Sequence, residues 1–310
     1  MAEGATVSPG PMSPLLPVLA LLFNAFVWGV SWWPLRELES LGLHPLWATA
    51  FVYAFALLCV LVVRPGAWRA FAHQPGLWLL AVAAGLTNVG FNWAVTVGDV
   101  VRVVLLFYLM PAWTVLLAWP LLGEKPTAAS LARLARAMAG VAVVLKTSGS
   151  SWPVPESLAD WLALMGGLAF SLTNIMLRRL RDSSSQARAT AIFGGGGLMA
   201  GAGAALGLAQ GIVPAPPAFG LPWGLLAMAL ALALIASNLC LQYGAARLSA
   251  QGTALVMLSE VIFASGSAIA LGSAELTLRI AVGGALILAA AIWSAWPAGP
   301  GQNARDQGGS

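Results

Sequence analysis

Apolar stretches long enough to cross a lipid bilayer follow one another along this chain and dominate what it can fold into. A membrane-spanning helix needs about 20 mainly apolar residues. By that criterion ten segments lie roughly at 15–35, 46–63, 77–97, 100–122, 130–147, 158–179, 189–209, 222–245, 250–271 and 276–296. Only 8% of the 310 residues are charged, against about 25% in soluble domains. The sequence therefore predicts an all-α integral membrane protein with ten transmembrane helices.

Basic residues near the segment ends indicate how the chain is oriented, because Lys and Arg favour the cytoplasmic side of a membrane. With the N-terminus in the cytoplasm, the inner side holds Arg64, Arg69, Lys125, Arg133, Arg136, Arg178, Arg179, Arg181, Arg188, Arg247 and Arg305. The outer side then holds only Arg36, Arg102, Lys146 and Arg279. We expect a multi-pass protein of a bacterial inner membrane with both termini cytoplasmic. Orientation in the lipid bilayer explains the basic charge without a nucleic-acid partner.

The two halves of the chain correspond in register. A shift of 150 positions pairs Asn88 with Asn238 and Asn92 with Gln242, and a shift of 142 pairs Trp28 with Phe170 and Ser31 with Thr173. Because five helices is an odd number, the second half must enter the membrane upside down, which is the inverted repeat of many secondary transporters. We expect repeat 1 at 15–149 and repeat 2 at 155–296, around a central cavity, with a flexible N-terminus at 1–14 and a disordered tail at 297–310.

Two residues near the middle of predicted helices are candidates for transport chemistry. Glu260 is the only acid well inside a segment, where a charge is unfavourable by about 2.5–3.5 kcal/mol. It is either a site for a substrate amine or a proton, or a hydrogen-bonding group between helices. Pro111 lies near the centre of 100–122 and leaves the carbonyl of Phe107 without a helical donor. That carbonyl either lines a cavity or marks a harmless kink.

Polar and aromatic residues add further candidates for substrate contact. Asn88 and Asn92 are four residues apart, so they share one helical face. They and their mates line a path for substrate or join helices by hydrogen bonds of about 0.6 kcal/mol each. The aromatic, sulfur and hydroxyl candidates are Trp28, Ser31, Tyr108, Trp113, Phe170 and Met257. An aromatic wall with few polar groups suits a bulky, partly apolar molecule, and ordinary core packing is the alternative.

Signals of enzymatic chemistry are absent from the sequence. It contains no GxGD pair, GxSG, HExxH or P-loop, so we expect no enzyme and no cofactor. His44 and His73 lie on opposite sides of the predicted membrane, which excludes a shared metal site. Asp99 is expected to cap the following helix and to pair with Arg102.

Several short motifs of the chain form a recognisable set: Trp28-Gly29, Pro111, Leu121-Leu122-Gly123-Glu124 with Thr127, Leu258-Ser259-Glu260, and Gly272-Ser273-Ala274-Glu275-Leu276-Thr277. At the level of these motifs the chain resembles the EamA-type drug/metabolite transporters. Within the family the chain looks most like the bacterial aromatic amino-acid exporters of the YddG kind. Two departures are Val261, where the family often has proline, and the Gly–Glu pair of the second half, which Ser273-Ala274 split.

This resemblance implies a ten-helix bundle that exports amino acids or related metabolites by alternating access, with Trp28, Pro111 and Glu260 near the cavity. We expect an exporter of aromatic or large neutral amino acids. The alternatives are an exporter of another metabolite, such as a sugar phosphate or nucleoside, and a membrane protein that does not transport. Energy coupling stays open between a proton carried by Glu260 and the substrate gradient alone.

Overall fold

The computed structural model describes residues 15–123, 128–145, 154–245, 247 and 256–295. Within this part of the chain, six helical runs are long and apolar enough to cross a membrane: Leu15–Ser40, Pro45–Val63, Gly76–Val97, Leu158–Arg179, Ser185–Ala209 and Leu221–Gly244. Shorter apolar helices lie at Val100–Thr114, Leu134–Val143, Ser259–Ala270 and Leu278–Ala289. The expectation of a helical, multi-pass membrane protein is therefore confirmed, whereas the number of ten membrane crossings stays a prediction.

The helices follow one another with short connections. They are α1 (Leu15–Val30), α2 (Trp32–Ser40), α3 (Pro45–Val63), the 3-10 turn η1 (Ala67–Arg69), α4 (Ala70–His73), α5 (Gly76–Val97), α6 (Val100–Phe107), α7 (Met110–Leu122), α8 (Ala128–Leu145), α9 (Leu158–Arg179), α10 (Ser185–Ala209), α11 (Leu221–Ala245), α13 (Ser259–Ala270) and α14 (Leu278–Ala295). Most ends lie within a few residues of the predicted segments.

Three predicted segments are interrupted rather than continuous. The first breaks at Ser31 and resumes as α2, which ends at Ser40. The fourth breaks at Tyr108 and Leu109, so Pro111 is the second residue of α7 and not the centre of one long helix. A proline is well tolerated there, because the first turn of a helix has no internal partner for its N–H groups. The ninth turns at Leu258 before α13 begins.

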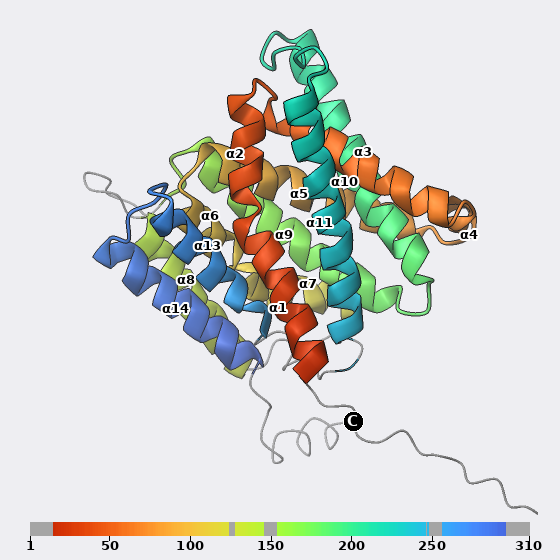
Figure 1. Ribbon diagram of the computed structural model, residues 1–310. Coiled ribbons are helices and arrows are strands. Elements are labelled where there is room, and N and C mark those ends of the chain that lie inside the picture. The colour runs from red at the N-terminus through yellow and green to blue at the C-terminus, as the bar shows by residue number, and fades with distance from the viewer. Residues whose placement is uncertain (1–14, 124–127, 146–153, 246, 248–255, 296–310) are drawn as a thin grey trace, which may run out of the picture.

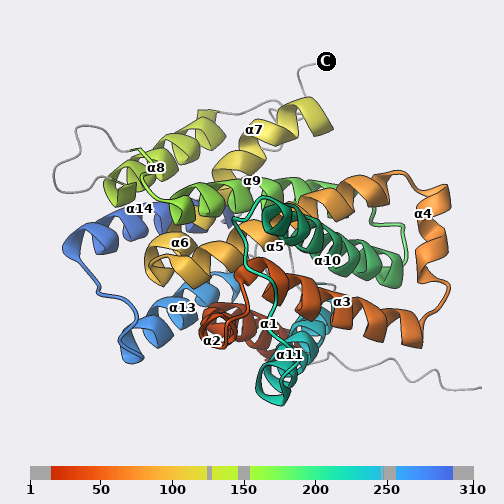
Figure 2. The ribbon, with the colours of Figure 1, turned by 90° about the horizontal axis from the view of Figure 1, so that it is seen from above.

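Figures 1 and 2 show α5 and α9 side by side at the centre of the bundle, with other helix pairs around them. On one flank α3 and α10 pack together, and on the other α8 packs against α14. The first helix, α1, lies between α11 and α13 and contacts both. The break between α6 and α7 is held against α9.

Small residues let the central helices approach closely, as expected where helices pack within lipid. A Cβ at Gly195 of α10 would overlap the carbonyl of Ala81 in α5, so the two backbones are in direct contact. A Cβ at Gly29 of α1 would lie 2.6 Å from the Cβ of Phe263 and 2.9 Å from the carbonyl oxygen of Glu260. Gly29 therefore brings α1 against the start of α13.

Candidate functional site

Two helix breaks meet in the interior, and their contact is the centre of the candidate site. Tyr108, at the end of α6, places its hydroxyl 3.0 Å from Oε2 of Glu260 and 3.1 Å from the carbonyl oxygen of Met257. The acceptors flank the break at Leu258, where Val261 donates its N–H to the Leu258 carbonyl. Tyr108 is 2% exposed and Glu260 is 8% exposed. The structure thus brings together three residues that the sequence predicted separately.

A buried amide extends this cluster to two more helices. Asn24 of α1 donates from Nδ2 to the sulfur of Met257 at 3.4 Å and accepts from the hydroxyl of Ser237 in α11 at 2.7 Å. Sequence reasoning missed Asn24, because the repeat register pairs it with Gly166 rather than with a second amide. The signal that could have found it is an amide side chain within the first apolar segment, one helical turn before Trp28.

Aromatic rings form a continuous line from α1 to α9. Trp28 contacts Phe91 edge-on with ring centroids 6.0 Å apart, Phe91 contacts Phe107 at 4.8 Å, and Phe107 contacts Phe170 at 5.4 Å. Trp28 and Phe170 were expected at the site, whereas Phe91 and Phe107 were not. Trp113 packs on the same core and buries its indole Nε1 without a partner within the described residues. These rings pack in the hydrophobic core, and their contact with a substrate stays a prediction.

The amides predicted from the repeat join neighbouring helices. Asn88 accepts from the hydroxyl of Tyr53 at 2.7 Å, and Asn92 donates to the hydroxyl of Thr49 at 3.3 Å, so both tie α5 to α3. In the second half Gln242 donates to Asn238 at 2.7 Å and accepts from Ser185, which ties α11 to α10. These contacts are those of interhelical hydrogen bonds, and substrate contact by these amides stays a prediction.

Ser31 likewise uses its hydroxyl within the protein. It donates to the carbonyl oxygen of Trp28 at 2.8 Å and so caps the break between α1 and α2. Its repeat mate Thr173 donates to the carbonyl of Ala169 at 3.0 Å and lies 3.4 Å from the hydroxyl of Thr87. Each of these hydroxyls thus donates to a backbone carbonyl about one helical turn earlier in the chain.

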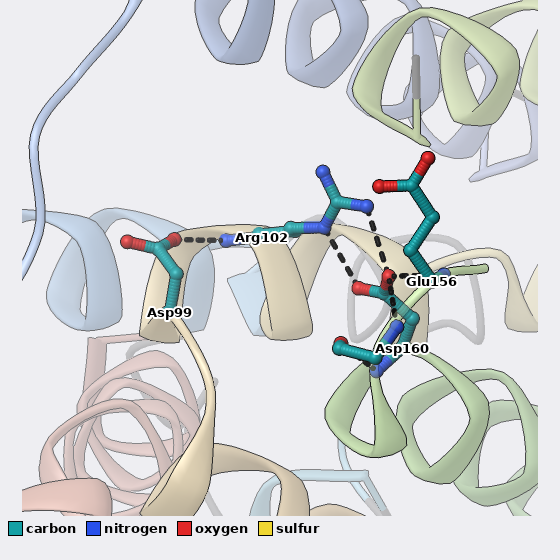
Figure 3. A network of polar contacts seen from close by, with 5 residues as sticks. Asp99, Arg102, Glu156 and Asp160 are labelled. Carbon is teal, nitrogen blue, oxygen red and sulfur yellow. Dashed lines mark hydrogen bonds and ion pairs between the residues drawn. The ribbon is translucent and has the colours of Figure 1, made fainter. Parts of the chain in front are cut away.

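A second polar network lies at one end of the bundle (Figure 3). Nε and a terminal nitrogen of Arg102 reach Oδ1 and Oδ2 of Asp160 at 2.7 and 2.9 Å. Asp160, 2% exposed in its side chain, also accepts the N–H groups of Glu156 and Ser157 at 3.2 and 3.4 Å. Asp99 caps α6 through the N–H of Arg102 at 2.7 Å, as expected. The guanidinium of Arg102, however, binds Asp160, because the cap turns the Asp99 carboxylate to the backbone.

His44 caps a helix near the same end. Its Nδ1 accepts the N–H of Leu46 at 3.3 Å at the start of α3, and its ring lies edge-on to Trp93 with centroids 5.3 Å apart. Burial lowers the pKa of His44 below its usual 6.5, which keeps Nδ1 free to accept.

Comparison with known proteins gives a family match for the first part of the chain. Residues 15–146 match the model of the EamA-like transporter family. The matched range lies within the first predicted repeat, and the match suggests a membrane transporter of the drug/metabolite type. It does not separate aromatic amino-acid exporters from other members.

The fold is also found in a solved crystal structure. That chain is 19% identical, and the alignment covers 90% of this chain and 96% of the other with a TM-score of 0.58. At this identity the likeness shows the fold alone. No curated protein matches this chain.

The surroundings of Glu260 are unusual for a carboxyl group within apolar helices. Intramembrane acids commonly pair with a basic side chain or face a water-filled path. Within the part of the chain that the structure describes, the side-chain partner of Glu260 is a phenol and no basic side chain contacts it. Transport chemistry that needs an acid without a counter-charge can be carried out there.

Proposed function

We propose that the protein is an EamA-type secondary transporter that exports amino acids, above all aromatic and other large neutral ones, across a bacterial inner membrane. It would work by alternating access between two inverted five-helix repeats. The observation that carries this proposal is the meeting of the two helix breaks at Tyr108 and Glu260, because broken helices at mid-membrane commonly form transport sites. The family match of residues 15–146 supports the same class.

The pairing of helices supports the inverted repeat. In the predicted repeat, α5 corresponds to α11, α9 to α1 and α10 to α3. The contact of α5 with α9 then corresponds to that of α11 with α1, and the contact of α10 with α5 corresponds to that of α3 with α11. In the contacting pairs α3–α10 and α8–α14, each helix is the repeat mate of the other. The break at Tyr108 falls on Leu258 when shifted by 150 positions, which is where the second break lies.

Contacts of single residues support the same symmetry. Ser171 donates to the carbonyl oxygen of Met110 at 2.7 Å. A shift of 142 relates Ser171 to Gly29, and a shift of 150 relates Met110 to Glu260. Gly29 packs against the carbonyl of Glu260, so a hydrogen bond in one half takes the place of a close backbone contact in the other.

The chemistry of the cluster supports an amino acid as cargo. The amide of Asn24 and the hydroxyl of Tyr108 can bind its polar end, and the rings that begin at Trp28 can contact an apolar side chain. A phosphorylated cargo needs Lys or Arg in the interior. Of the described basic residues near the bundle, Arg102 is bound by Asp160, and Arg36 donates to the carbonyls of Val95 and Gly98. These contacts favour an amino acid over a sugar phosphate.

Uptake of radiolabelled amino acids into liposomes that contain the purified protein tests the proposal. We expect saturable uptake of aromatic amino acids, competed by unlabelled large neutral ones and not by sugar phosphates. A Trp28→Ala variant should raise KM several-fold, and Trp78→Ala, at a ring 58% exposed on α5, is the matched control. Best competition by sugar phosphates or nucleosides would replace the cargo. No uptake of any of these by folded protein would overturn the proposal.

A further inference from the structure

We propose that Glu260 is a proton-binding site whose occupancy switches the hydrogen bonding between the two helix breaks, so that proton entry drives substrate export. This inference rests on the proposed function and adds the coupling ion to it. It follows from the number of protons that the Tyr108 hydroxyl, the Met257 carbonyl and the Glu260 carboxyl have for the hydrogen bonds between them.

The hydroxyl of Tyr108 has one proton and two acceptors within reach. Met257 offers a carbonyl oxygen at 3.1 Å, and Glu260 offers Oε2 at 3.0 Å. A carbonyl can only accept, and an ionised carboxylate can only accept. While Glu260 is ionised, the two acceptors share the single proton of the Tyr108 hydroxyl. When Glu260 carries a proton, it can donate to the phenol oxygen while Tyr108 donates to Met257, so that each contact has its own proton. The positions of the three groups therefore fit the protonated site, in which both hydrogen bonds are complete.

Loss of the proton changes which hydrogen bond forms. An ionised Glu260 attracts the hydroxyl proton of Tyr108 more strongly than a neutral carbonyl does, because charge-assisted hydrogen bonds are the stronger ones. The carbonyl of Met257 then loses its hydroxyl donor. Since Met257 immediately precedes the break at Leu258, deprotonation weakens the tie between α6 and the chain that enters α13. The proton thus controls how firmly the two breaks are held together.

The neighbouring helices offer Glu260 no other neutralising charge. Helix α1, which packs along α13, contains no ionisable side chain. In α6 the charged residue is Arg102, which binds Asp160. Helix α2 touches α13 through the indole of Trp32, which donates to Ser267 at 3.0 Å, while its Arg36 is turned to backbone carbonyls of α5 and the following residue. Among the described residues, only a proton is left to neutralise this carboxylate.

The transport step balances with one proton for one substrate molecule. The O–H bond of Glu260 breaks on the cytoplasmic side and forms again on the outer side, and no electrons are transferred. Two forms of the transporter change from one side of the membrane to the other: the empty form with Glu260 protonated, and the substrate-loaded form with Glu260 ionised. When only these two forms change sides, each exported substrate molecule is exchanged for one entering proton. The side chain of Glu260 is buried, and Gly29 of α1 packs against its backbone carbonyl, so its proton exchanges when the breaks separate.

Infrared spectroscopy of the purified protein tests the site without relying on transport. We expect a protonated carboxyl band near neutral pH that disappears as the pH is raised. The band should be missing in Glu260→Gln and shifted in Tyr108→Phe, because the phenol is its hydrogen-bond partner. Glu156→Gln, at an exposed carboxyl outside the cluster, is the matched control and should leave the band unchanged. A wild-type spectrum without this band, or one unchanged in Glu260→Gln, overturns the inference.

A transport measurement then tests the coupling. Liposomes that are acidic inside should show several-fold faster initial uptake by the wild-type protein than liposomes without a gradient. Saturable uptake that ignores the pH gradient, or that follows a sodium gradient instead, overturns proton coupling and leaves the proposed function standing. Absence of all uptake from protein that shows the carboxyl band contradicts the proposed function itself.

Discussion

Two buried carboxylates in this protein have opposite surroundings. Asp160 lies at the end of the bundle, where it binds the guanidinium of Arg102 at two points and accepts two backbone N–H groups. Glu260 lies where two helices break, and a phenol is its side-chain partner. A paired charge can be buried, whereas an unpaired one is strongly disfavoured. The comparison teaches that burial alone does not define a functional acid, because its partners decide whether its charge can change.

The sharpest test of this comparison replaces each carboxylate by its amide. Asp160→Asn should lower the free energy of unfolding by about 3 kcal/mol, because it removes the buried carboxylate that binds the guanidinium of Arg102 at two points. Glu260→Gln should change it by less than about 1 kcal/mol, because an amide can also donate to Tyr108. Thermal unfolding of both variants in one detergent measures the difference. Equal losses would mean that the two acids are both structural.

The packing of Glu260 against α1 can be tested at a glycine. Gly29→Ala places a methyl group against Phe263 and the carbonyl of Glu260, and such overpacking is unfavourable by about 1–3 kcal/mol. The control is Gly266→Ala in α13, where the new methyl group has open space around it. This variant should leave the free energy of unfolding unchanged or raise it by up to about 1 kcal/mol through helix propensity. Unfolding in detergent compares the two. An unaffected Gly29→Ala variant would show that α1 does not close on the site.

A smaller effect is expected from the amide that joins α1 to the cluster. Asn24→Ala and Ser237→Ala each remove the hydrogen bond between these residues, and interhelical hydrogen bonds in membranes contribute about 0.6 kcal/mol on average. The two single variants and the double variant form a cycle that isolates the coupling energy. A coupling near zero would limit the interior network to Tyr108, Met257 and Glu260.

The smallest effect concerns the pH dependence at the end of the bundle. Because burial lowers the pKa of His44 in the folded state, the unfolded chain binds more protons, and stability rises with pH. The contribution of His44 is complete above its ordinary pKa of 6.5 and is lost as the pH falls through the lower folded value. We expect less than about 1 kcal/mol. His44→Asn keeps an N-cap acceptor at every pH, so its unfolding should lose this part of the pH dependence.

Hydropathy was sufficient to place the helices but not their interruptions. The predicted segment 158–179 coincides with α9, because a capping box of Ser157 and Asp160 begins it and two arginines end it. The break at Tyr108 and Leu109 was missed, because the apolar run continues across it and the hydroxyl of Tyr108 donates to Glu260, which lies 152 positions further along the chain. Pro111 pointed to the correct region but lies after the break.

The candidate site was predictable where a single residue conflicts with its surroundings. An acid in an apolar segment identified Glu260, and Tyr108 and Met257 were aromatic and sulfur-containing candidates for substrate contact. Pairings between distant residues were not predictable, because Arg102 and Asp160 are 58 positions apart and Asn24 and Ser237 are 213 apart. Local patterns carry no information on such partners.

The contact of Gly195 with Ala81 has a mechanical consequence. Two helices whose backbones touch cannot slide past each other without first moving apart, so α5 and α10 form a rigid block. Arg36 fixes α2 to the end of the same block through the carbonyls of Val95 and Gly98. Any rearrangement that leaves this contact closed therefore moves α5, α10 and α2 together as one frame.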